Sequence, residues 1–483
     1  MCNMGTRDRV SWRFAIILAL VSLSAAGAQA EYGGGSGTME DPYQIWTAEQ
    51  LSALANEPND FDKHFKLMAD IDLAPYRDNS FRLIGYLFTG YDDNGRRYRA
   101  WHDFHGVFDG NGHTISNLMY TVEEPSPEDD PSNPLVAYGL FRYLAGEVRN
   151  LGLINPTIRP AATCTYDVAQ VGALAGDCHS GSIINCYVQG GQISGDDMVG
   201  GLVGYLGSPP MPQYIPPAIS NCHASCTVSC SRAGRPIWPR PGDAFGGLVG
   251  QSYGSILCSS AQGNVEAAGA AHVGGLVGRL HSNCTVEACF ATGRVTGGGK
   301  IGFGDTGGLI GLVEGSSVVR ASCSTGLVYG TISVGGLVGR MMGSAIRDCY
   351  SRGQVFGQER VGGLVGEASF LVRVECCYAT GAVSGTTKSQ AGGLIGAGSP
   401  PAGSSNCFWN RETSGLDTSA GGIGLTTTQM QNIQTYLRAG WDFVGEIVNG
   451  THDVWRMGVD GPAYPELAWQ EALPGDAVAA QGP

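Results

Sequence analysis

The pentapeptide Gly335-Gly336-Leu337-Val338-Gly339 decides the fold of this chain, because it returns as GGLVG or GGLIG along the sequence. The copies begin at Gly200, Gly246, Gly274, Gly307, Gly335, Gly362 and Gly392, and a degenerate copy, GALAG, begins at Gly172. Most copies are spaced by about 28 residues. A repeat of this length is typical of stacked architectures, in which each repeat forms one layer of a continuous core.

A second phrase follows most copies, and in it a Cys usually precedes an aromatic residue. Examples are CFATGRVTG from Cys289 and CYATGAVSG from Cys377. We assign eight cysteines to one slot of the repeat: Cys186, Cys222, Cys258, Cys289, Cys323, Cys349, Cys377 and Cys407. The same slot in successive layers lines up into a ladder, and free Cys behaves as a small buried hydrophobe. The sequence therefore predicts an inward ladder of unbridged thiols, above all at Cys186, Cys289, Cys323, Cys349 and Cys377. Disulfides remain open for Cys164 with Cys178 and for Cys226 with Cys230.

The remaining pattern within each repeat is that of short strands. Glycines separate a Leu-Val pair, a Cys-aromatic pair and a G-x-V-x-G segment, which predicts three short strands per repeat. Residues 136–410 show no helical periodicity of apolar residues. The predicted fold is all-β, a parallel β-solenoid (β-helix) of about 28-residue coils.

The ends of the chain differ from the repeats. Residues 1–30 have an Arg-containing start, a short apolar run and an A-x-A site, and are predicted to be a cleaved signal peptide. We expect an N-terminal cap with the leading coils in 31–135, the repeat solenoid in 136–410, a C-terminal cap in 411–470 and a disordered tail in 471–483. Capping boxes at Thr47 and Thr426 predict short helices, the first over 48–56, and these helices are expected to cover the two ends of the rod.

The charge of the chain limits the partners it can have. The formal net charge is −14, and Lys and Arg form no cluster. An acidic chain of this kind is unsuited to nucleic acid, so no nucleic-acid partner is expected. The apolar run in the leader is too short to span a bilayer. We therefore expect an exported protein, extracellular, at the cell surface or in the periplasm, with no integral membrane segment after cleavage.

The repeats resemble the GLUG motif of bacterial exported and surface proteins, among them parts of agglutinin-like proteins and immunoglobulin-A-cleaving peptidases. The flanks FHGVFDGNGHTISNL from Phe104 and CFWNRETSG from Cys407 are similar to the same group, and the resemblance covers nearly all of residues 31–470. It implies architecture and leaves activity open, because a shared fold does not imply a shared function. None of the nine His lies in an HExxH pattern, so a peptidase activity is not implied.

Two groups of residues are candidates for chemistry. The non-repeat segment 86–105 combines aromatic and acidic residues, and Trp101 with Asp92 and Asp93 suits sugar stacking or calcium binding. The alternative is an insertion that packs on the cap. Asp348 and Glu375 fall near one slot of neighbouring coils and would suit a polysaccharide lyase or glycoside hydrolase. A polar ladder at a turn, with Asn in the same slot elsewhere, explains them more simply.

The sequence thus favours a non-enzymatic, exported β-solenoid that acts as a structural or adhesive surface module, with extracellular glycans or surface proteins as partners. The alternative is a carbohydrate-active enzyme on the same scaffold. No catalytic residue and no cofactor are predicted, apart from the calcium considered above. The sequence does not indicate the identity of the ligand or the oligomeric state.

Overall fold

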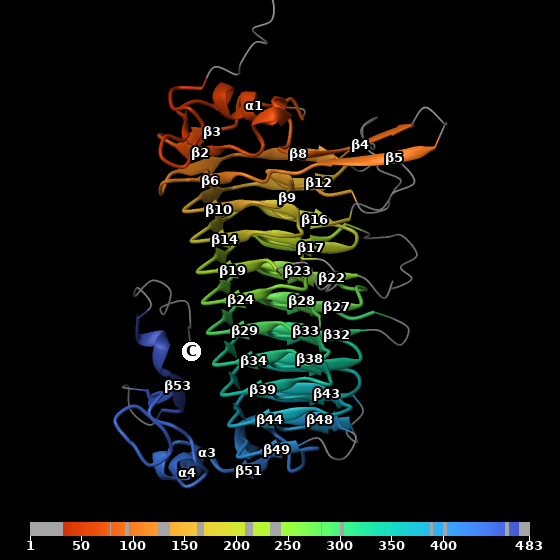
Figure 1. Ribbon diagram of the computed structural model, residues 1–483. Coiled ribbons are helices and arrows are strands. Elements are labelled where there is room, and N and C mark those ends of the chain that lie inside the picture. Colours follow the sequence, from red (N-terminus) through yellow and green to blue (C-terminus); the bar gives the residue numbers. More distant parts are fainter. Residues whose placement is uncertain are drawn as a thin grey trace, which may run out of the picture.

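The computed structural model is a straight rod of stacked coils with a smaller module along one flank (Figure 1). It describes residues 32–77, 79–91, 96–122, 136–161, 169–207, 216–231, 243–281, 283–299, 304–386, 390–398, 403–458 and 463–472. The predicted signal peptide and nearly all of the predicted tail lie outside these residues.

Five parallel sheets run the length of the rod, and each coil contributes one strand to most of them. Sheet 1 has 12 strands: β1 (Tyr43–Ile45), β2 (His64–Leu67), β6 (Val107–Asp109), β10 (Glu147–Arg149), β14 (Ser182–Ile184), β19 (Ala218–Ser220), β24 (Ser255–Leu257), β29 (Thr285–Glu287), β34 (Val318–Arg320), β39 (Ala345–Arg347), β44 (Arg373–Glu375) and β49 (Gly403–Ser405). Sheet 2 also has 12: β3 (Ile71–Asp72), β7 (Thr114–Ser116), β11 (Gly152–Ile154), β15 (Tyr187–Gln189), β20 (His223–Ala224), β25 (Ser260–Ala261), β30 (Phe290–Ala291), β35 (Cys323–Ser324), β40 (Tyr350–Ser351), β45 (Tyr378–Ala379), β50 (Phe408–Asn410) and β51 (Ile423–Leu425).

The other three sheets are shorter. Sheet 3 consists of β8 (Met119–Val122), β12 (Thr157–Pro160), β16 (Gln192–Gly195), β21 (Thr227–Cys230), β26 (Val265–Glu266), β31 (Val295–Thr296), β36 (Val328–Tyr329), β41 (Val355–Gly357) and β46 (Val383–Gly385). Sheet 4 consists of β17 (Met198–Gly200), β22 (Ala244–Gly246), β27 (His272–Gly274), β32 (Asp305–Gly307), β37 (Ser333–Gly335), β42 (Val361–Gly362) and β47 (Ala391–Gly392). Sheet 5 consists of β9 (Phe141–Leu144), β13 (Ala175–Cys178), β18 (Val203–Leu206), β23 (Val249–Ser252), β28 (Val277–Leu280), β33 (Ile310–Glu314), β38 (Val338–Met342), β43 (Val365–Ser369) and β48 (Ile395–Gly398).

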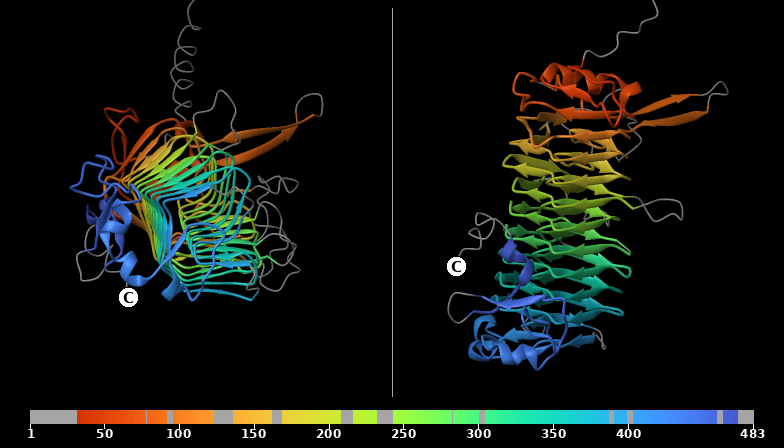
Figure 2. Two further views of the ribbon diagram at one scale, coloured as in Figure 1. Left: turned by 90° about the horizontal axis from the view of Figure 1, so that it is seen from below. Right: turned by 60° about the vertical axis from the view of Figure 1, so that its left-hand side comes forward.

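The predicted parallel β-solenoid is confirmed, but the number of strands per coil is higher than predicted. A complete coil, such as β14 to β18, has five strands instead of three. The two missed strands are the triplet with a central buried apolar residue before the Cys slot, such as Thr285–Glu287, and the x-V-G triplet that ends at the first Gly of the pair, such as Ser333–Gly335. Tight bends at the corners split what the sequence presents as single runs. Seen along the axis, successive coils superimpose (Figure 2, left).

The second glycine of each pentapeptide lies where neighbouring coils approach most closely. A Cβ on Gly336 would overlap the carbonyl oxygen of Gly363 in the next coil and the Ser351 hydroxyl. Gly201 and Gly275 meet the corresponding carbonyl oxygens of their own next coils. Glycine is therefore required here by the close approach of the next coil. It is not required by a left-handed backbone conformation, since these residues have no positive φ. The Leu that follows is fully buried in each copy, as Leu337 shows.

A sharp left-handed corner joins sheet 1 to sheet 2 in successive coils. The corner residues have φ between 45° and 55°: Asn150, Asn185, Asn221, Cys258, Ala288, Ala321, Asp348, Cys376 and Asn406. In the first half of the rod these side chains form an amide ladder, in which Asn221 donates to Asn185 (2.7 Å) and Asn185 to Asn150 (3.1 Å). Asp348 occupies this slot between Ala321 and Cys376, so the polar-ladder interpretation of Asp348 stays a prediction.

The residue after the corner forms the inward ladder, which contains Ser as well as Cys. In order, the ladder is Leu151, Cys186, Cys222, Ser259, Cys289, Ser322, Cys349, Cys377 and Cys407, and each member is buried. The Sγ of Cys289 donates to the Glu287 carbonyl (3.1 Å) and accepts from the Ser259 amide (3.4 Å). In turn, the Cys289 amide donates to the Ser322 hydroxyl (3.1 Å). From Cys186 onward the slot therefore holds a short side chain that can both donate and accept, and Ser meets that need as well as Cys.

This register corrects two assignments made from the sequence. Cys258 is exposed, because Ser259 takes the ladder position of its coil and leaves Cys258 at the corner. Cys323 is buried but lies one residue beyond the ladder, because Ser322 takes the slot, and Cys323 pairs with Phe290 and Tyr350 in the first position of sheet 2. Of the cysteines left open for disulfides, Cys178 and Cys226 are buried free thiols, and Cys164 lies outside the described residues.

The two ends are covered in different ways. The helix α1 (Ala48–Asn56) and the 3-10 turn η1 (Pro58–Asp60) lie over the N-terminal end of the rod (Figure 1). The α1 helix begins as predicted, with the Thr47 side chain accepting from the Gln50 amide. The C-terminal elements are α2 (Arg411–Ser414), α3 (Thr427–Met430), α4 (Ile433–Leu437), the antiparallel pair β52 (Trp455–Met457) and β53 (Pro465–Leu467), and η3 (Ala468–Ala472).

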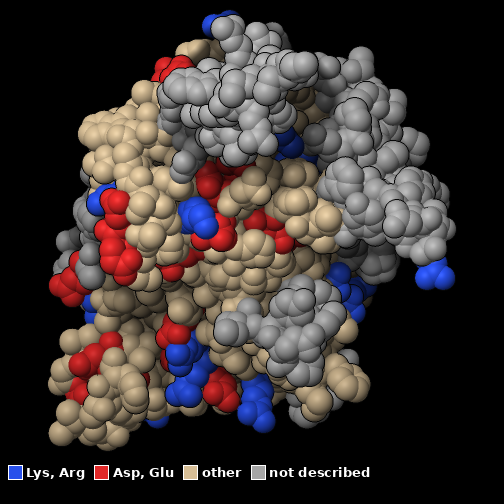
Figure 3. Space-filling view, turned by 45° about the horizontal axis from the view of Figure 1, so that its top comes forward, with Lys and Arg blue, Asp and Glu red and all other residues tan. Residues whose placement is uncertain are grey.

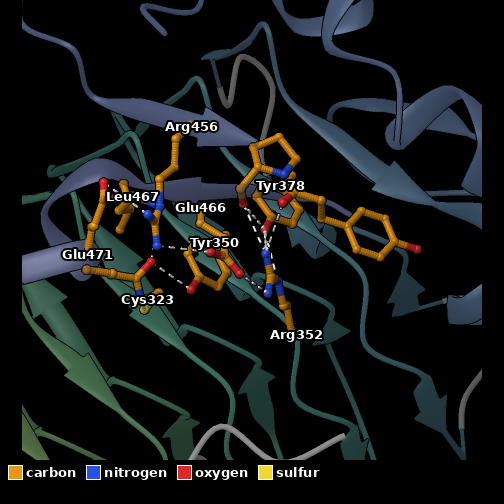
Figure 4. Close-up of polar contacts among 11 residues, drawn as sticks. Cys323, Tyr350, Arg352, Tyr378, Arg456, Glu466, Leu467 and Glu471 are labelled. Carbon is orange, nitrogen blue, oxygen red and sulfur yellow. Dashed lines mark hydrogen bonds and ion pairs between the residues drawn. The ribbon is translucent and has the colours of Figure 1, made fainter. Parts of the chain in front are cut away.

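The segment from Thr427 to Ala472, here called the C-terminal module, packs along the flank of sheet 2 (Figures 1 and 2). Its buried Trp441 and Trp455 contact an outward row on sheet 2 that includes Tyr350 and Tyr378. Arg352 joins the two parts, since it contacts both the Tyr378 hydroxyl (3.0 Å) and Glu466 (3.4 Å) (Figure 4). This part of the predicted C-terminal cap thus covers an outward aromatic row on sheet 2, and its role as an end cap stays a prediction.

Candidate functional site

The candidate site begins at a hairpin that interrupts the first strand position of sheet 5. Strands β4 (Tyr86–Tyr91) and β5 (Arg97–His102) pair antiparallel and project sideways from the rod (Figure 1). Their bases remain in the solenoid, since Ile84 bridges to Phe141 and Phe104 to Leu144 on β9. The segment predicted to be an insertion or a recognition element is thus a hairpin that is inserted into a solenoid strand.

Trp101 occupies the base of this hairpin and is 47% exposed. Its ring meets the Tyr143 ring edge to face, with centroids 4.9 Å apart. The structure therefore supports Trp101 as an accessible aromatic group. Asp92 and Asp93, predicted to accompany it, lie outside the described residues, so their part in the site stays a prediction.

A His-Asp cluster lies next to Trp101. Nε2 of His179 is 3.3 Å from Oδ2 of Asp103, and Nδ1 of His179 is 3.9 Å from Oδ1 of Asp177. Burial raises the pKa of Asp177 to about 7, despite the nearby His179. Burial also opposes charge on His179, but the hydrogen bond to Asp103 and the charge of Asp177 raise its pKa overall. Near neutral pH the Asp177 carboxyl therefore takes up or releases a proton.

The cluster continues as a row of outward side chains, one or two per coil, along sheet 5. Tyr143, Asp177 and Tyr205 are direct neighbours in register. We call the whole row the sheet-5 track, and its members are Trp101, Asp103, Tyr143, Asp177, His179, Tyr205, Gln251, Tyr253, Arg279, His281 and Glu314. Figure 3 shows acidic and basic side chains gathered on the face that Figure 1 presents, without separation into regions of one sign.

Aromatic and charged groups alternate along the middle of the track. The rings of Tyr205 and Tyr253 are 6.0 Å apart, and Tyr253 stacks on His281 at 3.8 Å. His281 and Arg279 both bind Oε1 of Glu314, at 2.7 Å and 2.9 Å. Burial works against the ionisation of Glu314, but these two partners lower its pKa to about 2. This part of the track therefore carries fixed charges at neutral pH.

Several acceptors in the track have no hydrogen-bond partner within the described part of the protein, namely Asp103 Oδ1, Asp177 Oδ1 and Gln251 Oε1. Gln251 is 8% exposed and lies in register between Tyr205 and Arg279. Its Oε1 atom accepts no hydrogen bond from the described residues. A buried polar atom without a partner is costly unless water or a ligand satisfies it. Either a water molecule or a bound group would complete the hydrogen bonding of Gln251.

Sequence reasoning missed Asp177, His179 and Tyr205. The available signal was local: Asp177 and His179 flank the buried Cys178 and so lie on the opposite face of the strand.

The structure also bears on the acid pair considered from the sequence, Asp348 and Glu375. Glu375 is the register partner of Arg347, and Asp348 lies one residue further on, at the corner. The structure therefore places Asp348 and Glu375 in different slots.

Metal binding was also considered. Within the described ranges, no group of three or more His, Cys, Asp or Glu side chains could hold a metal ion. The calcium prediction rests on Asp92 and Asp93 and is not tested by this observation. In the same part of the chain, no helix is both long and apolar enough to cross a membrane.

Comparisons with known proteins agree with the repeat. Residues 269–296 match the family model "The GLUG motif", which confirms the predicted resemblance. Halomucin of Haloquadratum walsbyi is 32% identical over 318 residues, covering 65% of this chain and 3% of halomucin. A "Putative Gly-rich membrane protein" of Evansella cellulosilytica is 31% identical over 167 residues, covering 34% of this chain and 16% of that protein. The chain thus matches a small part of each relative.

One solved structure covers most of the chain. The crystal structure titled "putative immunoglobulin A1 protease from Bacteroides ovatus" covers 91% of this chain and 95% of its own, with 17% identity and a TM-score of 0.40. A likeness this low carries no argument about activity. Taken together, the repeat and the sheets define a parallel β-helix with GLUG repeats.

Proposed function

We propose that this protein is an exported, non-enzymatic surface module that binds an extended glycan along the sheet-5 track. The observation that carries the proposal is the track itself, which begins at the exposed Trp101 and repeats outward aromatic and polar groups from coil to coil. Coils are stacked about 4.8 Å apart. A linear polymer with a regular repeat can therefore make similar contacts with several coils at once.

The chemistry of the track suits sugars. A sugar ring has a C–H face that packs on an aromatic ring and a rim of hydroxyls that both donate and accept hydrogen bonds. Trp101, Tyr205 and Tyr253 provide rings that are at least partly exposed, and Gln251 provides a buried acceptor. Specific sites combine apolar walls with a few fixed polar groups in this way.

A glycan panel tests the proposal. The protein is titrated with soluble polysaccharides, and binding is measured by calorimetry together with product release. We expect at least one linear polysaccharide to bind, and Trp101→Ala to weaken binding at least tenfold. The matched control is Trp46→Ala, which removes a Trp of similar exposure, 46%, from the N-terminal end of the rod. Binding that is lost equally in both variants, or in neither, would contradict the proposal.

A polysaccharide lyase or hydrolase is the second candidate, and one observation favours it. An acid with a pKa of about 7 beside a His can take up and release a proton at neutral pH. If the track cleaves its ligand, Asp177→Asn should abolish product formation and leave binding in place. If the module only binds, neither the wild type nor the variant forms product. Product formation by the wild type that Asp177→Asn abolishes would replace the binding proposal with the enzymatic one.

A further inference from the structure

A second recess lies far from the track, where the C-terminal module meets the corner between sheets 1 and 2. It is a cavity of ≈ 670 Å³, which falls within the range typical of small-molecule sites. We call it the module groove. The rod contributes Arg320, Arg347 and Asp348 to its lining, and the module contributes Asp442, His452 and Trp469.

The wall formed by the rod carries two arginines from adjacent coils. Arg320 and Arg347 are register partners, and their side chains are 54% and 61% exposed. Each forms one ion pair, Arg320 with Glu287 (2.7 Å) and Arg347 with Asp348 (3.1 Å). A guanidinium has five N–H donors, more than one carboxylate can accept. The rod therefore presents guanidinium donors and carboxylate acceptors side by side.

The wall formed by the module is fixed by its own hydrogen bonds. Asp442 accepts from the backbone amides of His452 (2.9 Å) and Asp453 (3.3 Å). The indole of Trp469 donates to the Ala321 carbonyl (2.9 Å), which holds its ring against the corner. Because the Asp442 carboxylate already serves to shape this loop, the groove is better suited to holding a ligand than to acid-base chemistry.

The geometry points to the module groove as a binding site for a small neutral saccharide, independent of the track. The lining has four carboxylates and two guanidinium groups: Glu287 and Asp348 pair with Arg320 and Arg347, and Asp442 and Asp453 accept from backbone amides. Each of these carboxylates is therefore already engaged, which favours a neutral ligand over an ion. Hydroxyl groups can donate to carboxylates and accept from guanidinium groups, and a fixed Trp ring offers an apolar face. Since the two walls belong to different segments, a bound saccharide would also hold the module against the rod.

Calorimetry on the full chain tests this inference, with glucose, galactose, N-acetylglucosamine and their disaccharides as probes. At least one probe should bind saturably to the wild type, and Arg347→Ala should weaken that binding at least tenfold. The matched control is Arg373→Ala, which removes an exposed Arg from the next strand of sheet 1 but not from the groove lining. Trp101→Ala should leave binding unchanged, which separates this site from the track. The bound probe should also slow proteolytic release of the module.

Three results would overturn the inference. The first is that none of these saccharides binds. The second is binding that survives in Arg347→Ala and disappears in Trp101→Ala, which would assign the ligand to the track. The third is tighter binding of glucuronate or glucosamine than of glucose, which would contradict the argument that the charges of the lining are already engaged. The track proposal can fail without affecting these outcomes, because its probes are polymers and its variant is a different residue.

Discussion

The outer face of sheet 2 has two halves that use the same repeat position in opposite ways. Tyr187 begins β15 in the first half and is 36% exposed. Tyr378 begins β45 in the second half and is fully buried beneath the C-terminal module. The interior of the coils is the same in both halves. The comparison teaches that the repeat fixes the inside of the rod, whereas the function of an outward position depends on what covers it.

The largest effect on stability is expected in the interior of the rod, where the two halves should not differ. Gly336→Val should destabilise the protein by about 4–5 kcal/mol or prevent folding, because its side chain would overlap backbone in the next coil. Gly201→Val in the first half should behave alike. Urea unfolding measures both, with Gly403→Ala as the control at an uncrowded glycine. A clear difference between the two halves would show that the coils are not equivalent inside.

Substitutions of the covered Tyr378 and of the uncovered Tyr187 should have very different effects on the free energy of unfolding. Tyr378→Ala should cost about 3 kcal/mol, because it opens a cavity between the rod and the module. Tyr187→Ala should change the free energy of unfolding by less than about 0.5 kcal/mol, since its ring is partly solvated. Equal effects in urea unfolding would show that the module does not make the difference.

Substitutions in the inward ladder are expected to change the free energy of unfolding by less, and again by similar amounts in both halves of the rod. Cys289→Ala should cost about 1–2 kcal/mol, because the buried Ser259 amide loses its acceptor. Cys289→Ser should cost less, because Ser already occupies this slot at Ser259 and Ser322. A Ser variant that is less stable than the Ala variant would refute the hydrogen-bonding role of the ladder and favour a purely apolar one.

The last effect concerns pH and the track. The pKa of Asp177 is about 7 in the folded protein and near 4 in an unfolded chain. The folded state therefore binds the proton more tightly, and this group lowers stability as pH rises from about 4 to about 7. Asp177→Asn should be more stable than the wild type at pH 8, and the difference should disappear towards pH 4. Thermal unfolding across this range checks the sign, and a gain largest at pH 4 would contradict it.

The architecture could be predicted from the sequence because stacking imposes the same steric demand on every coil. The recurrence of Gly336 and its equivalents indicates the length of the repeat, and the buried Leu after each of them indicates the core. The register was harder, because Ser and Cys satisfy the same hydrogen bonds. A Cys at 258 or 323 therefore looks like the ladder residue when Ser259 or Ser322 holds that place.

The candidate site was less predictable, because it depends on groups brought together from separate coils. Trp101 was identified because it lies outside the repeat. Asp177 and His179 lie in a degenerate coil, and their partner Asp103 comes from the base of the hairpin. The flank position of the C-terminal module likewise depends on contacts such as Arg352 with Glu466, which are far apart in the chain.

The central claim is that two things decide which repeat positions are accessible: the register of each coil and the cover provided by the C-terminal module. Thiol labelling read by mass spectrometry tests this claim most directly. In the native chain, Cys258 should react at once, whereas Cys323 and Cys289 should react only after unfolding. In a chain that ends after Leu425 and so lacks the module, Cys323 should become reactive while Cys289 stays protected. Cys323 that remains protected without the module, or Cys289 found in a disulfide, would contradict the account.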